Sequence, residues 1–555
     1  MKIVEYLIKL FVEEHLTEIC FLIIFSLGVN ILTTNVITYF NSTLINAVQQ
    51  GLLVDTIQNF KYFIYARVFT AIFQLAYKLI QDVVMTDLKQ WSRYQLIKTV
   101  FQTNNENFSN VNFTKLSVPI NRLSETFLQI VGDTLNYTFP YVMFVLVAII
   151  YFFHQNVEIG TLFFIGNILW ITVLAYIFPT LRTRNIKYEN DSMTIERHLT
   201  ENLNNIDKII TRGQINEEAS LFDEEKNTAI NSHRDYYYSV SITKFVIEMV
   251  TLLTMFLCIG HSINLYFKEK ITIIQFIAIT TLLFVFKERL NSTAALVSDN
   301  IEQYGRLEAI LDWFNETEDK LDLMQKKYKN TNLSFEKVKF EDVTFQYDVK
   351  NEKVFDKKTM ELNTNNNKIV GIVGKSGKGK STFVKLLLKL YDANEGSIFI
   401  DDVNIKEVSP DYLRDNITFI NQNSRLFDKT VLDNILYGCK KQNECKDHYQ
   451  HILSYPKIQA LYENVDLANG LAGYSGENLS GGQRQIANII SGLINPSKIL
   501  VLDEPTNALD KELKMELIDI IKYFKPHKQC ILIITHDKDV YPIFDEQLKL
   551  LKKMR

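Results

Sequence analysis

Cysteine is scarce in this chain, with 5 residues among 555, and those few follow no pattern that would tie a fold together. No CxxC pair and no cluster of histidine and cysteine at zinc spacing occurs, which argues against a disulfide framework and a structural zinc site. Cys439, Cys445 and Cys530 lie in the polar part of the chain. We expect these three to be free thiols in a reducing cytosol.

An excess of either charge is also missing. The formal net charge is -4 at pH 7, and the sequence pI is about 6.2. Without a broad basic field the chain lacks the electrostatic attraction that nucleic-acid binding requires, so we expect no nucleic-acid partner. Short basic tracts such as Lys357–Lys358 are interpreted as solvated surface.

Long apolar runs are present, and all of them lie before residue 290. A helix needs about 20 mostly apolar residues to cross a bilayer. The candidate spans lie near residues 17–40, 60–84, 136–154, 159–181, 242–267 and 271–287. This pattern predicts a polytopic α-helical membrane domain of six spans over residues 1–315. A soluble protein that buries these runs in a core is the weakest alternative.

Positive charge is concentrated in every second connection between these spans. The loops 41–59 and 155–158 contain no Lys or Arg, whereas the stretches between spans two and three and between spans four and five are long and basic. Basic loops remain on the cytosolic side, so we expect both termini in the cytosol. We also expect helices in the two basic stretches, as extensions of the spans. Ahead of the first span, Ile3, Leu7, Leu10 and Phe11 share one helical face, and we expect it to lie flat on the membrane.

Residues 316–335 are polar and are predicted to be a linker, and residues 336–555 have the pattern of an α/β P-loop domain. The run KIVGIV leads into a glycine-rich loop that ends in Gly379, Lys380 and Ser381, and a helical pattern follows. This strand–loop–helix context is the one a Walker A motif requires. The loop would wrap phosphates with backbone N–H groups, Lys380 would reach the β- and γ-phosphates, and Ser381 would bind Mg²⁺. The phosphate-binding residues predicted here are Gly374, Lys375, Ser376, Gly377, Lys378, Gly379, Lys380, Ser381 and Thr382.

Two further strand patterns end in polar residues. The run ILVL ends in Asp503 and Glu504, and the run CILIIT ends in His536. We expect Asp503 to hold Mg²⁺ and Glu504 to polarise the attacking water. His536 follows its strand at the corresponding place, which favours a role at the site over an ordinary structural histidine.

A second glycine pair occurs in LSGGQ, residues 479–483, without a lysine of the P-loop kind. With the Walker A run, Asp503–Glu504 and His536, it resembles the nucleotide-binding domain of an ABC transporter, specifically over 336–555 and more loosely over 1–335. In that family LSGGQ closes over ATP held by the P-loop of a second domain. The resemblance therefore implies that Ser480, Gly481, Gly482 and Gln483 bind nucleotide across a dimer.

The same resemblance implies roles for other residues. Tyr347 matches the aromatic residue that stacks on adenine, and Gln422 matches the Q-loop glutamine that senses Mg²⁺ and takes part in catalysis. Asp510 matches the D-loop, and His536 matches the histidine that contacts the γ-phosphate. The segments 111–125 and 201–218 match the coupling regions, with plain solvated loops as the alternative.

This chain departs from the family pattern at several positions. Tyr474 stands where exporters usually have a glutamate, Asn507 replaces the D-loop serine, and Asn421 replaces the proline before the Q-loop glutamine. The arginine usual after the signature is replaced by Ile490. None of these changes removes a phosphate, Mg²⁺ or water ligand. Hydrolysis is therefore expected to persist, with communication to the membrane domain in question.

The resemblance implies an ATP-driven exporter or flippase of a lipid, peptide or amphipathic small molecule, with ATP and Mg²⁺ as cofactors. One nucleotide-binding domain per chain implies a dimer with a second copy or a related half-transporter. The alternative is an ATP-gated regulator or channel. Polar residues within the spans are substrate-site candidates by default, with structural roles as the alternative: Arg67, Gln74, Lys78, Glu248 and Gln275.

Overall fold

The computed structural model describes residues 2–106, 116–311, 314–321, 328–329, 332–347, 352–374, 379–422, 425–507 and 509–549. The chain divides into two compact units. The helical unit comprises Met1–Val100 and Asn112–Leu321, and the α/β unit comprises Phe101–Val111 and Asp322–Arg555. The short segment Phe101–Val111 thus groups with the α/β unit, although it lies within the predicted membrane domain.

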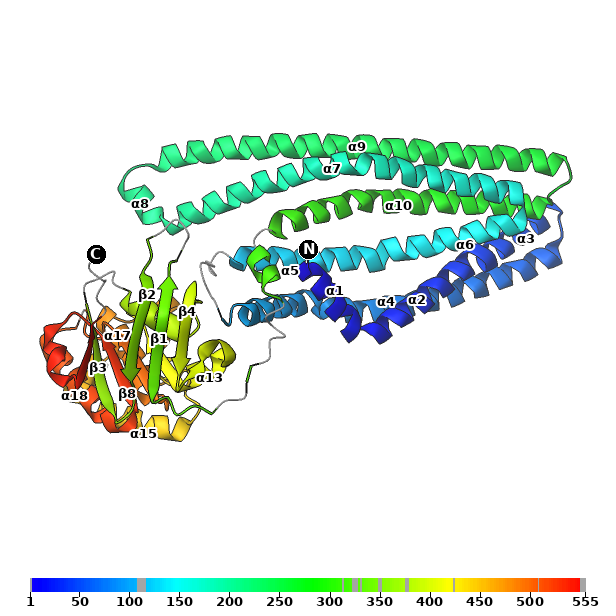
Figure 1. Cartoon of the computed structure of the whole chain (residues 1–555). Helices are drawn as coiled ribbons and strands as arrows, with labels where there is room; N and C mark the ends of the chain where they lie inside the picture. The colour runs from blue at the N-terminus through cyan, green and yellow to red at the C-terminus, as the bar shows by residue number, and fades with distance from the viewer. Residues whose placement is uncertain are drawn as a thin grey trace. The chain divides into compact units, whose positions relative to one another are not determined.

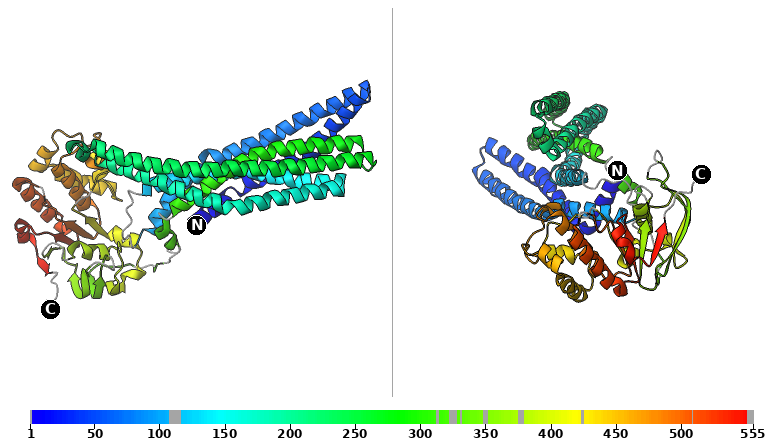
Figure 2. Two further views of the ribbon diagram at one scale, coloured as in Figure 1. Left: turned by 90° about the horizontal axis from the view of Figure 1, so that it is seen from above. Right: turned by 90° about the vertical axis from the view of Figure 1, so that its left-hand side faces the viewer.

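The helical unit is built from long helices that pack along one another (Figure 1; Figure 2). Its shorter elements near the N-terminus are α1 (Lys2–Glu14), α2 (Leu16–Ile31), the π-helix η1 (Leu32–Ile37) and α3 (Thr38–Gln49). The others are α4 (Leu53–Thr103), α5 (Ser117–Asp133), the π-helix η3 (Thr134–Thr138), α6 (Phe139–Gln155), α7 (Val157–Asn204), α8 (Ile206–Thr211), α9 (Ile215–Phe267), α10 (Ile273–Leu311) and α11 (Asn315–Asp319). Aromatic and aliphatic side chains of α6, α7, α9 and α10 form its core, with Phe152, Phe163 and Phe286 in mutual contact.

Within the described residues, five helical segments are long and apolar enough to cross a membrane. They are Leu16–Gln49, Leu53–Thr103, Ser117–Gln155, Val157–Asn204 and Ile215–Phe267. The sixth predicted span lies in α10, where the apolar run is followed at once by Lys287, Glu288 and Arg289. In α4 only 6% of the most apolar window is buried within the protein. Such a surface requires lipid or another apolar partner.

The spans extend as helices far beyond their apolar parts, as the basic stretches predict. The helices α4, α7 and α9 have 51, 48 and 53 residues, more than twice what a bilayer needs. The short helix α8 lies between α7 and α9, inside the predicted coupling segment 201–218. Of the other coupling segment, residues 111–115 lie outside the described part of the chain.

The apolar face of α1 that the sequence assigns to a membrane surface packs against protein instead. The side chains of Ile3, Leu7 and Phe11 are buried within the helical unit. Phe11 packs edge-on against Trp91 of α4 and Phe127 of α5, and the backbone N–H of Ile3 donates to Glu318. A face that is apolar enough for a bilayer surface is equally suited to a protein surface, and hydrophobic periodicity does not distinguish the two.

The polar residues in the spans divide into two groups. Arg67, Gln74 and Lys78 lie on the outside of α4, where Arg67 stands over the Phe63 ring and Lys78 pairs with Asp82. No ion pair joins Arg67 to Glu248 among the described residues. The side chain of Gln275 accepts hydrogen bonds from the Thr272 N–H and hydroxyl. Gln275 is therefore a cap at the start of α10.

The α/β unit contains two sheets. One is antiparallel, in the order β2 (Phe355–Asn363), β1 (Lys337–Phe345), β4 (Glu395–Ile400), β5 (Val403–Asn404). The other is parallel, in the order β6 (Ile417–Ile420), β7 (Ile499–Asp503), β8 (Cys530–Ile534), β3 (Lys368–Val373), β9 (Glu546–Lys549). The strands β7 and β8 are buried on both faces, which is why their sequences are continuous apolar runs.

Helices cover the parallel sheet on both faces. They are α12 (Lys380–Leu387), α13 (Pro410–Asn416), α14 (Val431–Ile435), α15 (Gln442–Leu453), α16 (Pro456–Leu461), α17 (Gly481–Ile494) and α18 (Lys511–Phe524). Short 3-10 turns lie at Ile405–Glu407, Tyr474–Gly476, Lys525–His527 and Lys538–Ile543. The helices α17 and α18 bury one apolar face each against the sheet, in a core that includes Ile490. Ile490 thus serves packing.

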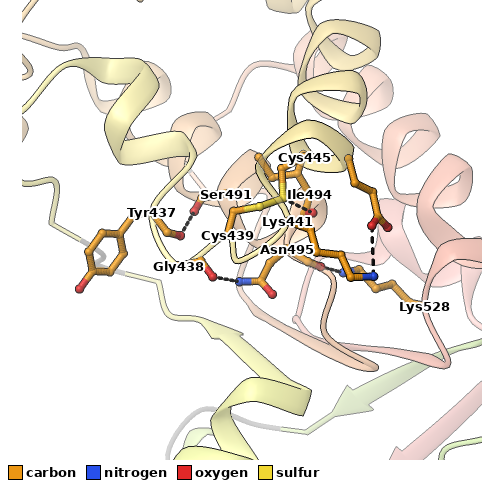
Figure 3. The surroundings of a disulfide bond; sticks show 10 residues. Tyr437, Gly438, Cys439, Lys441, Cys445, Ser491, Ile494, Asn495 and Lys528 are labelled. Atoms are coloured by element: carbon orange, nitrogen blue, oxygen red, sulfur yellow. Dashed lines mark hydrogen bonds and ion pairs between the residues drawn. A yellow bond between two sulfur atoms is a disulfide. The ribbon is translucent and has the colours of Figure 1, made fainter.

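The expectation of free thiols is wrong for one pair of cysteines. Cys439 and Cys445 form a disulfide across the turn that enters α15, and Figure 3 shows it beside the end of α17. Cys445 Sγ lies 3.3 Å from the carbonyl oxygen of Ile494 in α17. A six-residue separation carries no sequence signature, because only the turn brings the two sulfur atoms together. Cys20 is exposed and free, and Cys258 and Cys530 are buried and free.

Alkylation of the folded protein tests this cysteine pattern. We expect a membrane-permeant maleimide to modify Cys530 slowly, because burial raises the pKa of the Cys530 thiol to about 12. Cys439 and Cys445 should react only after treatment with a reductant. The readout is peptide mass spectrometry with and without reductant, and rapid labelling of Cys439 in the untreated protein would contradict the disulfide.

Candidate functional site

The site lies at one edge of the parallel sheet, where adjacent strands end. The strand β8 pairs in register with β7 on one side and with β3 on the other. Because the carboxyl ends of parallel strands meet at the same edge, the loops after β3, β7 and β8 come together. These loops contain the Walker A residues, Asp503–Glu504 and His536, so the structure brings together the groups that the sequence predicts.

The described residues of the Walker A loop are Gly374 at its start and Gly379 to Ser381 at its end. Gly379 adopts φ +84°, a left-handed conformation that favours glycine, and it precedes the first turn of α12. Lys380 is 9% exposed, and its ammonium donates to the carbonyl of Gly374 at 2.7 Å. The lysine thus spans the loop from its end to its beginning. The predicted residues Lys375, Ser376, Gly377 and Lys378 lie outside the described residues.

A hydroxyl and a carboxylate lie side by side beneath this loop. Ser381 Oγ donates a hydrogen bond of 2.7 Å to Asp503 Oδ2. Burial raises the pKa of Asp503 above its ordinary value, and the hydrogen bond from Ser381 acts in the opposite direction. The pair presents two oxygen ligands of the kind that a hard divalent cation prefers.

The Glu504 carboxylate is held in place by its neighbours. His536 Nδ1 lies 2.8 Å from Glu504 Oε1, and the Thr535 hydroxyl donates to Oε2 at 3.2 Å. Glu504 is 9% exposed and adopts φ +52°, an uncommon conformation for a residue with a side chain. Strained backbone of this kind is often found at functional sites. The His536 side chain is 77% exposed and remains accessible to a ligand.

Tyr347 lies beside the start of α12. Its hydroxyl is 2.8 Å from that of Thr382, and its ring packs edge-on against Phe345 and Tyr391. The Lys385 ammonium lies 5.7 Å from the centre of the Tyr347 ring. An aromatic ring is therefore fixed next to the phosphate-binding helix, in a position suited to stacking on a base.

The signature glycines Gly481 and Gly482 begin the helix α17 and leave its N-terminus accessible. Ser480 caps α17 in a capping box with Gln483, because each side chain bonds the backbone N–H of the other residue. Gly481 would have no atom within 4 Å of an added Cβ, and neither Gly481 nor Gly482 has a positive φ. Nothing described within this chain therefore requires glycine at position 481.

A cavity of about 520 Å³ lies between the Q-loop and the signature helix. Gln422, Asp503 and Gly481 all line it. Departures from the family pattern line it as well, namely Asn421, Tyr474 and Asn507. Three of the four departures from the family pattern are thus gathered in one place.

Arg484 is a residue of the site that the sequence analysis missed, and Asp510 has a structural role that it did not predict. Arg484 lines the same cavity and donates to the carbonyls of Gly476 and Leu479, so it holds the turn that precedes the signature. Its place directly after LSGGQ is the signal that could have identified it. Asp510 caps α18 by accepting from the N–H groups of Glu512 and Leu513, and its contact with nucleotide stays a prediction.

Residues just beyond the end of α4 are anchored in the α/β unit, close to the phosphate-binding helix. Lys389 follows α12 and forms an ion pair of 2.6 Å with Glu106, and their side chains are only 2% and 7% exposed. Arg414 donates to the Asn105 side chain at 2.5 Å. A buried ion pair tolerates the loss of one partner poorly. Asn105 and Glu106 are therefore held firmly next to α12.

Comparison with known proteins identifies the family. The family model described as "ABC transporter transmembrane region" matches residues 16–290, and the one described as "ABC transporter" matches residues 357–507. The chain therefore belongs to the ABC transporters, as an integral membrane protein that joins the transmembrane region to the nucleotide-binding domain.

Relatives support the same assignment. The chain is 35% identical to the ATP-dependent lipid A-core flippase of Haemophilus ducreyi over 38% of this chain and 36% of the flippase. It is 24% identical to the lactococcin-A transport/processing ATP-binding protein of Lactococcus lactis over 83% of this chain and 62% of that protein. The matches thus span less than two thirds of the relatives' own length. The structure of a bacterial Atm1-family ABC exporter with ATP bound has the same fold, with a TM-score of 0.79 at 18% identity over 97% of this chain and 94% of that chain.

Breaking the buried ion pair should destabilise the α/β unit. In Glu106→Gln the Lys389 charge stays buried without its counter-ion, at a cost of roughly 3–5 kcal/mol. We expect the first thermal unfolding transition of the detergent-solubilised protein to shift down by several degrees.

The double variant Glu106→Leu/Lys389→Met should recover most of this loss, because it removes both charges. Asp415→Asn is the matched control, since the Lys440–Asp415 pair is exposed and should contribute little. Equal shifts of the unfolding transition in Glu106→Gln and Asp415→Asn would contradict a stabilising role for the buried Lys389–Glu106 pair.

Proposed function

We propose that this chain is a half-transporter that uses ATP hydrolysis to export or flip a lipid, a peptide or an amphipathic small molecule. The observation that carries the proposal is the arrangement at the sheet edge. The Ser381–Asp503 pair lies beside the Glu504 carboxylate, which His536 holds in position. The relatives named as a lipid A-core flippase and a lactococcin-A transporter support the transport role.

The residues divide the work of binding and hydrolysis among them. Tyr347 stacks on the adenine, and the Walker A backbone with Lys380 neutralises the β- and γ-phosphates. Ser381 and Asp503 hold Mg²⁺, with Gln422 completing its surroundings from the Q-loop. Glu504 orients and polarises the attacking water, and His536 contacts the γ-phosphate while it keeps Glu504 in place.

We further propose that two chains complete the site together, as two copies of this chain. Gly481 and Gly482 form an open helix end that no described neighbour in this chain crowds. A helix N-terminus with bare N–H groups binds anions. The signature of one copy closes on the γ-phosphate held by Lys380 of the other. A related half-transporter in place of the second copy would satisfy the same geometry.

The charge bias of the loops supports an orientation with both termini in the cytosol. The α/β unit then meets cytosolic ATP. ATP-driven closure of the two units would bias a two-state membrane domain and give alternating access.

Replacing the catalytic carboxylate tests hydrolysis. Glu504→Gln keeps the shape of the side chain but removes the charge that polarises water, so we expect ATPase activity in nanodiscs to fall by at least about 100-fold. Binding of ATP should persist in a filter-binding assay. Glu395→Gln, at an exposed position in β4, is the control. Wild-type protein that binds ATP without hydrolysing it would instead point to an ATP-gated switch.

A pair of glycine substitutions tests the shared site. The methyl group added by Gly481→Ala meets no described atom of its own chain, so we expect unchanged thermal stability but loss of ATP-dependent dimerisation and of ATPase activity. Gly476→Ala should lower stability, because Gly476 has φ +85° and its added Cβ would lie 2.6 Å from Arg484 Cδ. Full activity in Gly481→Ala would contradict the closing role of the signature.

A further inference from the structure

A second cavity lies in the helical unit, away from any residue assigned so far. Its volume is about 810 Å³, within the range of small-molecule sites. One wall is formed by α2, η1 and α3, and the other by α6. Both walls belong to segments that are long and apolar enough to span a membrane.

The chemistry of the lining changes along the cavity. Along α6 the lining residues are first Val147 and Ile150 and then His154 and Gln155. On the opposite wall, Leu27 and Ile31 precede the polar residues Asn35 and Tyr39 along the chain. The Asn30 side chain donates to the Pro140 carbonyl at the beginning of α6, so the two walls start together. The lining is therefore wholly apolar at one end, and toward the other end polar side chains are mixed with Val36, Phe40 and Tyr151.

The polar end coincides with the place where α6 ends. Gln155 is the last residue of α6, and Asn156 caps α7. This end of the cavity therefore lies where a span leaves the bilayer, and the apolar end lies deeper. An amphiphile in the adjoining leaflet would have the same polarity profile.

The polar side chains of the lining have unused hydrogen-bonding groups. Asn35, Tyr39, His154 and Gln155 line the cavity, and their side chains make no hydrogen bond to any described residue. Where the span reaches the headgroup region these groups are open to a polar partner, and polar groups in spans usually face a partner or a functional cavity. Asn35 lies in the π-helix η1, a helix type that often marks a functional site.

We propose that this cavity binds an uncharged amphiphile with one alkyl chain and a hydrogen-bonding headgroup. The alkyl chain lies along Leu27, Ile31 and Ile150, and the headgroup bonds His154 and Gln155. The lining contains no Asp, Glu, Lys or Arg, so it offers no counter-ion to a charged headgroup. The proposal rests on the transport function proposed above, of which it specifies the substrate class.

Photolabelling tests the site directly. The probe is a monoacylglycerol with a diazirine in its alkyl chain, added to the full-length protein in nanodiscs. We expect saturable labelling of peptides within 27–40 and 147–155, competed by unlabelled monoacylglycerol. Ile150→Trp should fill the cavity and reduce labelling at least 5-fold. Leu75→Trp, at another exposed apolar position on a spanning helix, should leave it unchanged.

A second variant tests the site even if Ile150→Trp misfolds. His154→Leu/Gln155→Leu should weaken competition by monoacylglycerol at least 5-fold and leave competition by dodecane unchanged. Labelling in Glu504→Gln should equal that of wild type, because Glu504 does not line this cavity. Saturable labelling of a wild-type protein that shows no ATPase activity would overturn the transport proposal and leave the site in place.

Three results would overturn the proposal. Labelling that rises without saturation over all spanning helices would mean bulk lipid contact only. A lysophosphatidic acid or an alkyl quaternary ammonium that competes as well as monoacylglycerol would show that the site does not select an uncharged headgroup. Absence of labelling together with efficient disulfide cross-linking of Tyr39→Cys between chains would mean that a second copy covers this surface.

Discussion

The in-register parallel pairing of β3, β8 and β7 is the constraint on which the nucleotide site depends. Hydrogen bonds along these strands fix where each strand ends, and the loop after each strand begins at the same edge. Lys380, Asp503 and His536 come from distant parts of the sequence. A slip of one residue in either pairing would turn alternate side chains to the opposite face and separate Ser381 from Asp503.

The sequence predicts the structure correctly where a run of apolar residues follows directly from burial in the sheet or in the bilayer. The strands β7 and β8 are apolar because both of their faces are buried, so the end of each run marked the polar group at the sheet edge. The long helices were predictable for a similar reason, because a bilayer demands unbroken apolar runs. The fold class could therefore be read from Lys380, Asp503 and the spans before any contact was known.

The features that the sequence missed depend on contacts between distant segments. The face of α1 was assigned to a membrane because periodicity does not say what covers it, and Phe11 meets Phe127 only in three dimensions. The Cys439–Cys445 disulfide depends on a turn, and the buried partner of Glu106 lies almost three hundred residues away at Lys389. Each of these required knowledge of tertiary packing.

The capping box at Ser480 has a consequence for the kinetics of association. Because Ser480 and Gln483 already bond each other's backbone, the end of α17 is ordered before any partner arrives. Binding partners that need no reorganisation lose less conformational entropy on docking, and rigid surfaces associate faster than those that must first fold. An anion approaching Gly481 thus meets a preorganised surface, and the slow motions of a working cycle would have to arise elsewhere in the chain.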